Sequence, residues 1–147
     1  MPERTELEPL PYNTIPQAIC AAAARYGEKP AIIDGARRVS YAELAGLMVR
    51  AGAAFCANGL ATGDRVSTWA PNGLDWVVAA LGVQAAGGCI VPLNTRFKGG
   101  EAGYILGRSR ARFLVVTEKF LGESFRDKLA GQDLPALERI VALPSVS

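Results

Sequence analysis

The chain has 147 residues, enough for one domain with its own core, and half of these residues are hydrophobic. Its 16 Lys and Arg residues and 14 Asp and Glu residues leave a net charge of +2, which gives no electrostatic reason to expect a nucleic-acid partner. The chain contains no histidine, so its own residues cannot form a Ser-His-Asp triad, a Cys-His pair or a two-histidine metal site.

The chain also shows no pattern of a secreted or membrane protein. Residues 1–8 mix charges of both signs and no apolar run follows them, which is unlike a secretory signal. The longest apolar stretch, residues 76–89, is interrupted by Gly and Gln and is too short to cross a bilayer. We therefore expect a cytoplasmic protein without a transmembrane segment. The cysteines Cys20, Cys56 and Cys89 have no CxxC spacing, and we expect them to be small buried apolar residues.

Residues 13–59 predict a helix, a hairpin and a second helix. Apolar residues recur at helical spacing in 15–26, after Asn13 and Thr14 and before Gly27. Residues 31–34 and 38–40 flank a Gly turn and predict a hairpin. The Ser40 and Glu43 pair has the spacing of a capping box, which predicts the start of the next helix. The predicted buried face of that helix is Leu44, Met48, Ala51 and Phe55, and Gly59 is predicted to end it.

From residue 65 onward, strands and helices are predicted to alternate. The strands cover residues 65–70, 89–92, 113–117 and 139–143, and the helices cover 74–85, 101–108 and 120–129. Asn72 is the predicted N-cap of the first of these helices. Its predicted buried face is Leu74, Val77, Val78, Leu81 and Ala85. Such alternation is typical of right-handed crossovers, so we predict an open, mostly parallel α/β sheet flanked by helices.

A search for phosphate-binding glycine motifs finds none of the standard kinds. The chain has no GxxxxGK[ST] and no GxGxxG between a strand and a helix. Gly87 and Gly88 follow a predicted helix and are interpreted as a helix end. Gly99 and Gly100 precede a helix and could offer free N–H groups to a phosphate, but Glu101 in the first turn would repel it.

The remaining polar and aromatic candidates are interpreted as structural. Asp64 and Arg65 lie in a Gly-Asp turn before a strand. Trp69 and Trp76 are expected in the core or in a crevice wall, since no basic stripe accompanies them. An arginine run is expected to form a solvated rim, namely Arg108, Arg110 and Arg112. No residue is therefore assigned a catalytic, cofactor-binding or metal-binding role.

Three segments, taken in order, resemble the adenylate-forming superfamily, which includes acyl-CoA synthetases, peptide-synthetase adenylation domains and luciferases. Residues 39–44, Val-Ser-Tyr-Ala-Glu-Leu, resemble its first core motif, and 63–66, Gly-Asp-Arg-Val, follow at the expected place. Residues 81–94 resemble the second core motif, in which an Ala-Gly helix end leads into a strand that finishes in Pro-Leu-Asn. Residues 94–99 and 101–106 are similar to the fatty-acyl and related carboxylate CoA ligases of bacteria.

This resemblance covers residues 14–143 but only the opening part of the family's large domain. It implies an N-terminal extension at 1–13 and the N-terminal part of an AMP-binding domain at 14–147. It also implies a complete enzyme that uses ATP, Mg²⁺ and coenzyme A to convert a carboxylic acid into its CoA thioester. The family's ATP loop, ribose-binding acid and catalytic lysine have no counterpart here, so the chain alone is expected to be inactive.

Two other functions remain open from the sequence: a free-standing α/β ligand-binding module, and an interaction subunit that pairs with a second chain. Residues 90–91 and 113–116 are predicted to be strands buried on both faces, as parallel strands commonly are. If their cover lies elsewhere, the chain exposes an apolar patch or a strand edge. We therefore expect it to bind a hydrophobic dye and to self-associate.

Overall fold

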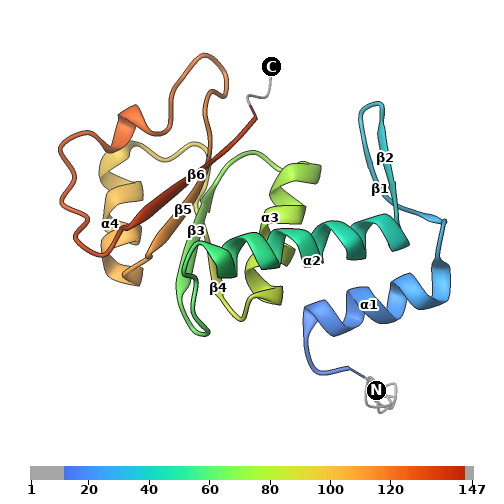
Figure 1. The fold of residues 1–147 in the computed structure, drawn as a ribbon. Helices are drawn as coiled ribbons and strands as arrows, with labels where there is room; N and C mark the ends of the chain where they lie inside the picture. Colours follow the sequence, from blue (N-terminus) through green and yellow to red (C-terminus); the bar gives the residue numbers. More distant parts are fainter. Residues whose placement is uncertain (1–11, 145–147) are drawn as a thin grey trace, which may run out of the picture.

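The computed structural model describes residues 12–144, which are built around a four-stranded sheet with helices on both faces (Figure 1). The extension predicted at 1–13 lies, apart from its last two residues, outside the described part of the chain. Helices α2 and α3 cover one face of the sheet and α4 covers the other, while α1 packs against α2 and α3. No helix among the described residues is long and apolar enough to cross a membrane.

The N-terminal elements form as their sequence predicts. Helix α1, Ile15–Tyr26, begins where Thr14 Oγ1 accepts the N–H of Gln17 at 3.3 Å, and it ends at Gly27. Strands β1, Pro30–Asp34, and β2, Arg37–Ser40, form an antiparallel hairpin. Helix α2, Tyr41–Ala57, starts with the predicted capping box, in which Ser40 Oγ accepts the Glu43 N–H at 3.2 Å and Glu43 Oε2 accepts the Ser40 N–H at 2.8 Å.

The open parallel α/β sheet is also confirmed. Its strands are β3 (Arg65–Trp69), β4 (Cys89–Pro92), β5 (Phe113–Thr117) and β6 (Arg139–Leu143), and they lie in the order β4-β3-β5-β6. Every pairing between them is parallel. Helix α3, Leu74–Ala85, connects β3 to β4 across one face, and α4, Gly99–Ser109, connects β4 to β5 across the other.

Two apolar clusters cover the two faces of this sheet. On the α3 face, Val66, Phe113 and Val115 pack with residues of α2 and α3. On the α4 face, Trp69 is fully buried and stacks on Phe125, with ring centroids 4.7 Å apart and planes within 7°. A third cluster joins α2, α3 and the hairpin. The main core therefore follows from side chains that alternate between faces along β3 and β5.

Several details of α3 differ from the prediction. Its N-cap is Gly73 and not Asn72, and Asp34 Oδ2 of β1 accepts the Leu74 N–H at 2.9 Å. Ala85, predicted to be buried, is exposed, whereas Ala79, Ala80, Gly82 and Val83 are buried together with Leu74 and Leu81. The reason is that α3 lies between the sheet and α1–α2 and so has apolar neighbours on two sides, which a single-stripe pattern does not capture.

The predicted helix at 120–129 is wrong. Residues 118–138 form an irregular connection with a short bridge between Phe120 and Glu123 and a single 3-10 turn, η1, at Asp127–Leu129. Leu121 and Gly122 both have positive φ, 50° and 79°, which a helix does not allow. The apolar residues Phe120, Phe125 and Leu129 have a spacing that resembles a helix, but they contact the core from separate points of an irregular chain.

The predicted burial was also wrong for one strand and for the three cysteines. Strand β4 is the outer strand of the sheet, so Ile90 and Val91 are only half-buried, whereas all of β5 is buried as predicted. Cys20, Cys56 and Cys89 are exposed, not buried. Cys20 and Cys56 lie on the outer surfaces of α1 and α2, and Cys89 is the first residue of the edge strand β4. No other helix or strand of the described residues covers these three positions.

Candidate functional site

The carboxyl ends of the strands form the candidate site. Strands β3 and β5 are neighbours, and the connection that follows β3 (α3) lies on one face of the sheet whereas the connection that follows β5 (residues 118–138) packs on the other, so the chain diverges between their carboxyl ends. Open α/β sheets bind ligands in the crevice that such a switch point creates. A cavity of about 520 Å³ lies here, lined by Asp34, Arg37, Pro71, Asn72, Gly73, Asp75, Trp76, Thr117, Leu143 and Pro144.

The charged groups of this crevice are engaged with the protein itself. Arg37 donates two hydrogen bonds to Asp75, at 2.8 and 2.9 Å, and Asp34 accepts the first N–H of α3. The hydrogen bonds from Arg37 hold the pKa of the Asp75 carboxyl below its ordinary value, and the same bonds raise the pKa of Arg37. The sequence left two places open for each tryptophan, the core or a crevice wall: Trp76 forms part of the wall, and Trp69 belongs to the core.

The described residues that line the crevice mix polar and apolar groups and form no catalytic constellation. Asp75 is bound to Arg37, and Asp34 serves as a helix cap, which leaves no carboxylate in this crevice free to act as a general base. Within residues 12–144, no group of three or more His, Cys, Asp or Glu side chains could hold a metal ion. Mg²⁺ commonly needs only one or two carboxylates, but both carboxylates of the crevice, Asp34 and Asp75, are bound to protein groups, so the residues present here do not fit an Mg²⁺ site.

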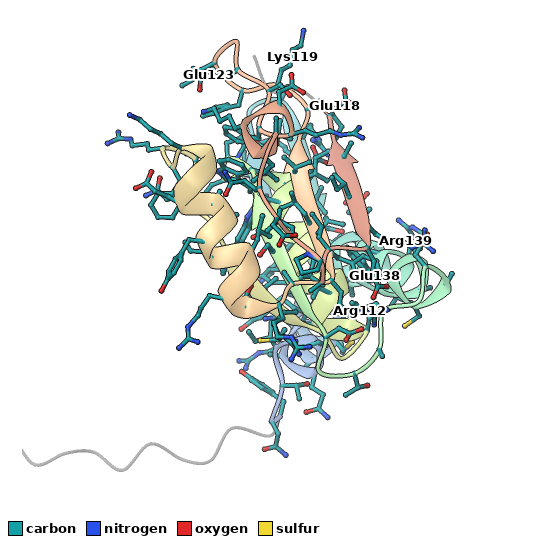
Figure 2. The ribbon with its side chains drawn as sticks, turned by 90° about the vertical axis from the view of Figure 1, so that its left-hand side faces the viewer. Arg112, Glu118, Lys119, Glu123, Glu138 and Arg139 are labelled. Atoms are coloured by element: carbon teal, nitrogen blue, oxygen red, sulfur yellow. The ribbon has the colours of Figure 1, made fainter. Side chains whose placement is uncertain are left out.

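The Asp64 and Arg112 side chains meet at the opposite, amino end of the sheet. Arg112 binds Glu138 in bidentate fashion, at 2.8 and 2.7 Å, and also pairs with Asp64, whose carboxylate accepts the Ala61 N–H at 2.8 Å (Figure 2). Structural use of Asp64 is thus confirmed. The rim interpretation is wrong for Arg112, which links three strand beginnings, while Arg108 and Arg110 are exposed as expected.

The glycine pairs singled out in the sequence serve helix ends and close packing. Gly87 has φ 82° and its N–H donates to Gln84 at 3.0 Å, which confirms the helix end. At Gly99, a Cβ would lie 1.8 Å from the Lys128 carbonyl oxygen, so that glycine allows the 118–138 segment to pass close to the start of α4.

Sequence reasoning missed the charged residues of the crevice, although it placed Trp76 in the core or in a crevice wall. Asp34 and Arg37 come from the hairpin, and Asp75 follows them by about forty positions, so no local spacing connects them. The order of the strands is the only signal that could have located this end of the sheet, because a switch point is defined by topology.

Comparison with known proteins identifies the class to which this fold belongs. The model of the AMP-binding enzyme family matches residues 20–146, and the chain belongs to that family. Among curated relatives, it is 40% identical over 132 residues to the 3-[(3aS,4S,7aS)-7a-methyl-1,5-dioxo-octahydro-1H-inden-4-yl]propanoyl:CoA ligase of Rhodococcus jostii, covering 87% of this chain and 26% of the relative. A mitochondrial medium-chain acyl-CoA ligase of Danio rerio is 30% identical over 124 residues, covering 82% and 20%.

Solved structures of acyl-CoA synthetases also match the fold of this chain. The N-terminal domain of FACL13 from Mycobacterium tuberculosis matches with a TM-score of 0.81 at 23% identity, covering 90% of this chain and 34% of that one. The anthranilate CoA ligase AuaEII, solved with anthranoyl-AMP, matches with a TM-score of 0.77 at 28% identity, covering 92% and 26%. The chain thus spans about a quarter of the length of the curated relatives named here, and it corresponds to an N-terminal part of the adenylate-forming fold.

Proposed function

We propose that residues 14–147 are the first part of the AMP-binding domain of an ATP-dependent carboxylate–CoA ligase and that the chain alone makes no acyl-adenylate. In this proposal the complete enzyme joins a carboxylic acid to AMP from Mg-ATP, releases pyrophosphate and transfers the acyl group to coenzyme A. The observation that carries the proposal is the 40% identity, over 87% of this chain, to the CoA ligase of Rhodococcus jostii named above.

The geometry is consistent with a scaffold role. The motif residues of 39–44 and 81–94 form a capping box, a helix end and a strand, and their polar contacts are to the protein itself. Trp69 Nε1 donates to the Asn94 carbonyl at 3.0 Å, which fixes the end of the second motif against β3. In this chain the motifs shape one end of a sheet, and the reacting groups come from elsewhere in the enzyme.

Pyrophosphate exchange tests this proposal. Purified 1–147 is incubated with ATP, labelled pyrophosphate and a panel of acids: a medium-chain fatty acid, anthranilate, and the indenyl-propanoate named for the Rhodococcus relative. We expect background exchange with every acid. Acid-dependent exchange by 1–147 alone would overturn the proposal.

A complementation experiment tests whether the complete enzyme is a CoA ligase. The part of the Rhodococcus relative that this chain does not cover is purified and mixed with 1–147, and exchange and acyl-CoA formation are measured. We expect the mixture to be active and each part alone to be silent. A mixture that forms the adenylate but no thioester would point to another branch of the family.

One observation favours a second candidate, the free-standing ligand-binding module. The crevice of about 520 Å³ lies where such modules bind nucleotides, and Trp76 stands in its wall. Titration of 1–147 with ATP, AMP and coenzyme A, followed by tryptophan fluorescence and calorimetry, distinguishes the two. Stoichiometric binding that Trp76→Ala abolishes, without any exchange activity, would favour the module.

A further inference from the structure

Helix α4 ends on a residue that is poorly suited to its backbone conformation. Arg110 follows the last turn with φ 52° and ψ 44°, in the left-handed region where glycine or asparagine is usual. Its N–H donates to the Gly107 carbonyl at 3.1 Å, and the Ala111 N–H donates to the Leu106 carbonyl at 3.2 Å, so the helix end itself is regular. An arginine here carries a conformational cost that a glycine would not. Residues held in such strain are concentrated at sites that bind ligands.

A groove of about 210 Å³ lies beside Arg110, at the amino end of the sheet. It runs between the last turns of α4 and residues 134–137, which lead into β6. These two segments pack together through the core cluster on the α4 face. Apart from Arg110, the lining is apolar and consists of Leu106, Gly107, Ala111, Leu134, Pro135, Ala136 and Leu137. Both walls of the groove are therefore built by elements that contact one another within the described chain.

Gly107 leaves the helix wall of this groove open. The residue is exposed, and a Cβ there would meet no atom within 4 Å. Glycine inside a helix costs stability relative to alanine, and no packing contact of the described residues requires it at this position. Two other glycines of α4, Gly99 and Gly103, do have such a reason, since they pack closely against Lys128 and Gln132. The missing side chain at Gly107 instead gives solvent access to the groove.

The charge of this groove is positive and is not neutralised. No carboxylate lines the groove, and within residues 12–144 the Arg110 guanidinium forms no salt bridge. A second cation is close, because Arg65 donates to the Arg110 carbonyl at 3.4 Å. Of the acids that flank 134–137 in sequence, Glu138 is held by Arg112 and Asp133 lies outside the lining (Figure 2). Apolar walls with one available guanidinium suit an anion that has an apolar tail.

We propose that this groove binds a short-chain monocarboxylate, with its carboxylate on the Arg110 guanidinium and its alkyl chain against Leu106, Leu134 and Leu137. A guanidinium and a carboxylate have matching planar geometry and can form two parallel hydrogen bonds. The volume sets the chain length, since 210 Å³ equals the space of about seven waters, and pentanoate has a similar number of non-hydrogen atoms. The groove lies at the opposite end of the sheet from the crevice, so binding there does not depend on the activity proposed above.

The first test is a titration of 1–147 with sodium pentanoate at pH 7 and constant ionic strength, followed by methyl NMR. We expect saturable shifts of the Leu106, Leu134 and Leu137 methyl signals. Pentan-1-ol has the same chain without the charge, and inorganic phosphate has charge without the chain. Because each lacks one half of the recognition, both should bind about tenfold more weakly, or less.

An Arg110→Gly variant separates binding from stability. Glycine is the residue that this helix end favours, so the free energy of unfolding should rise, whereas the affinity for pentanoate should fall by about tenfold or more. A merely structural role of the arginine would not move the two quantities in opposite directions. Arg108→Gln is the matched control, because it removes a neighbouring exposed arginine that does not line the groove, and it should change the affinity by less than about twofold.

A second pair of variants blocks the groove without changing its charge. Gly107→Leu places a side chain at the open wall and should abolish the methyl shifts. Gly100→Leu is its control, since Gly100 is also exposed in α4 with nothing within 4 Å of a Cβ, but it does not line the groove. Circular dichroism and urea unfolding check that all variants are folded. The proposal is overturned if pentanoate causes no saturable shift, if pentan-1-ol or phosphate binds as tightly, or if folded Arg110→Gly or Gly107→Leu binds as the parent does.

Discussion

Asp34 is a helix cap supplied from a distant strand. Its carboxylate accepts the Leu74 N–H at 2.9 Å, so a residue of β1 satisfies one of the free N–H groups at the start of α3. The negative charge also lies near the positive end of the helix dipole. Asn72 is nearer in sequence and has the right side chain, but its position before Gly73 leaves it outside the cap.

Two alanine substitutions test whether Asp34 or Asn72 caps α3. We expect Asp34→Ala to lower the free energy of unfolding by about 1 kcal/mol, the usual cost of losing a helix cap. Asn72→Ala should leave it unchanged within the error of urea unfolding. Asp34→Asn keeps an acceptor oxygen and should recover much of the loss. A larger effect at Asn72 than at Asp34 would contradict the observed cap.

At the scale of elements, the close crossing of α2 and α3 depends on glycine. A Cβ at Gly82 would lie 2.4 Å from Ala51 Cβ and 3.0 Å from its backbone carbon. A Cβ at Gly52 would lie 3.1 Å from Ala85 Cβ. The Leu-Gly pair of the second motif therefore sets the distance between two helices, a packing role that the sequence pattern alone did not reveal.

This crossing predicts opposite effects for two glycine substitutions in helices. Gly82→Ala forces α2 and α3 apart, and we expect it to lower the free energy of unfolding by about 1–3 kcal/mol. Gly107→Ala, in α4, meets nothing within 4 Å and should raise it by about 0.5–1 kcal/mol through helix propensity. Urea unfolding of both variants measures the difference. A neutral Gly82→Ala would mean that the two helices can separate without loss.

Local signals predicted most elements, and long-range contacts account for the errors. The capping box at Ser40, the helix end at Gly87 and the apolar run of β5 each depend on neighbours in sequence, and all three are confirmed. The irregular 118–138 segment was misread because Phe125 within it stacks on Trp69, which lies far away in sequence. The crevice was missed for the same reason, since the hairpin and α3 meet only after folding.

At the scale of the whole molecule, an ion-pair network holds the amino ends of the strands. Arg112 at the start of β5 pairs with Asp64 before β3 and with Glu138 before β6. The hydrogen bonds from Arg112 hold the pKa of Glu138 below its ordinary value of 4.5. The unfolded chain therefore binds a proton at this carboxylate more readily than the folded protein does.

This network predicts a pH dependence of stability. Because the folded-state pKa of Glu138 is lowered, its contribution is fully present above about pH 4.5 and is lost as the pH falls through the folded-state value. Glu138→Gln should thus lower the free energy of unfolding at pH 7 and make little difference near pH 3. Urea unfolding at both pH values, at one protein concentration, measures this. Glu28→Gln controls for the loss of one exposed carboxylate, and an unchanged gap between pH 7 and pH 3 would refute the assignment.

The contact between Asp34 and α3 also bears on the order in which the chain assembles. A local cap forms as soon as its own turn does, but this one closes a loop of about forty residues and must wait for the hairpin to dock. Until then the first turn of α3 lacks one of its acceptors and frays. We therefore expect the contact between Asp34 and Leu74 to form late in folding. Its loss, in Asp34→Ala, should speed unfolding while leaving the rate of folding nearly unchanged.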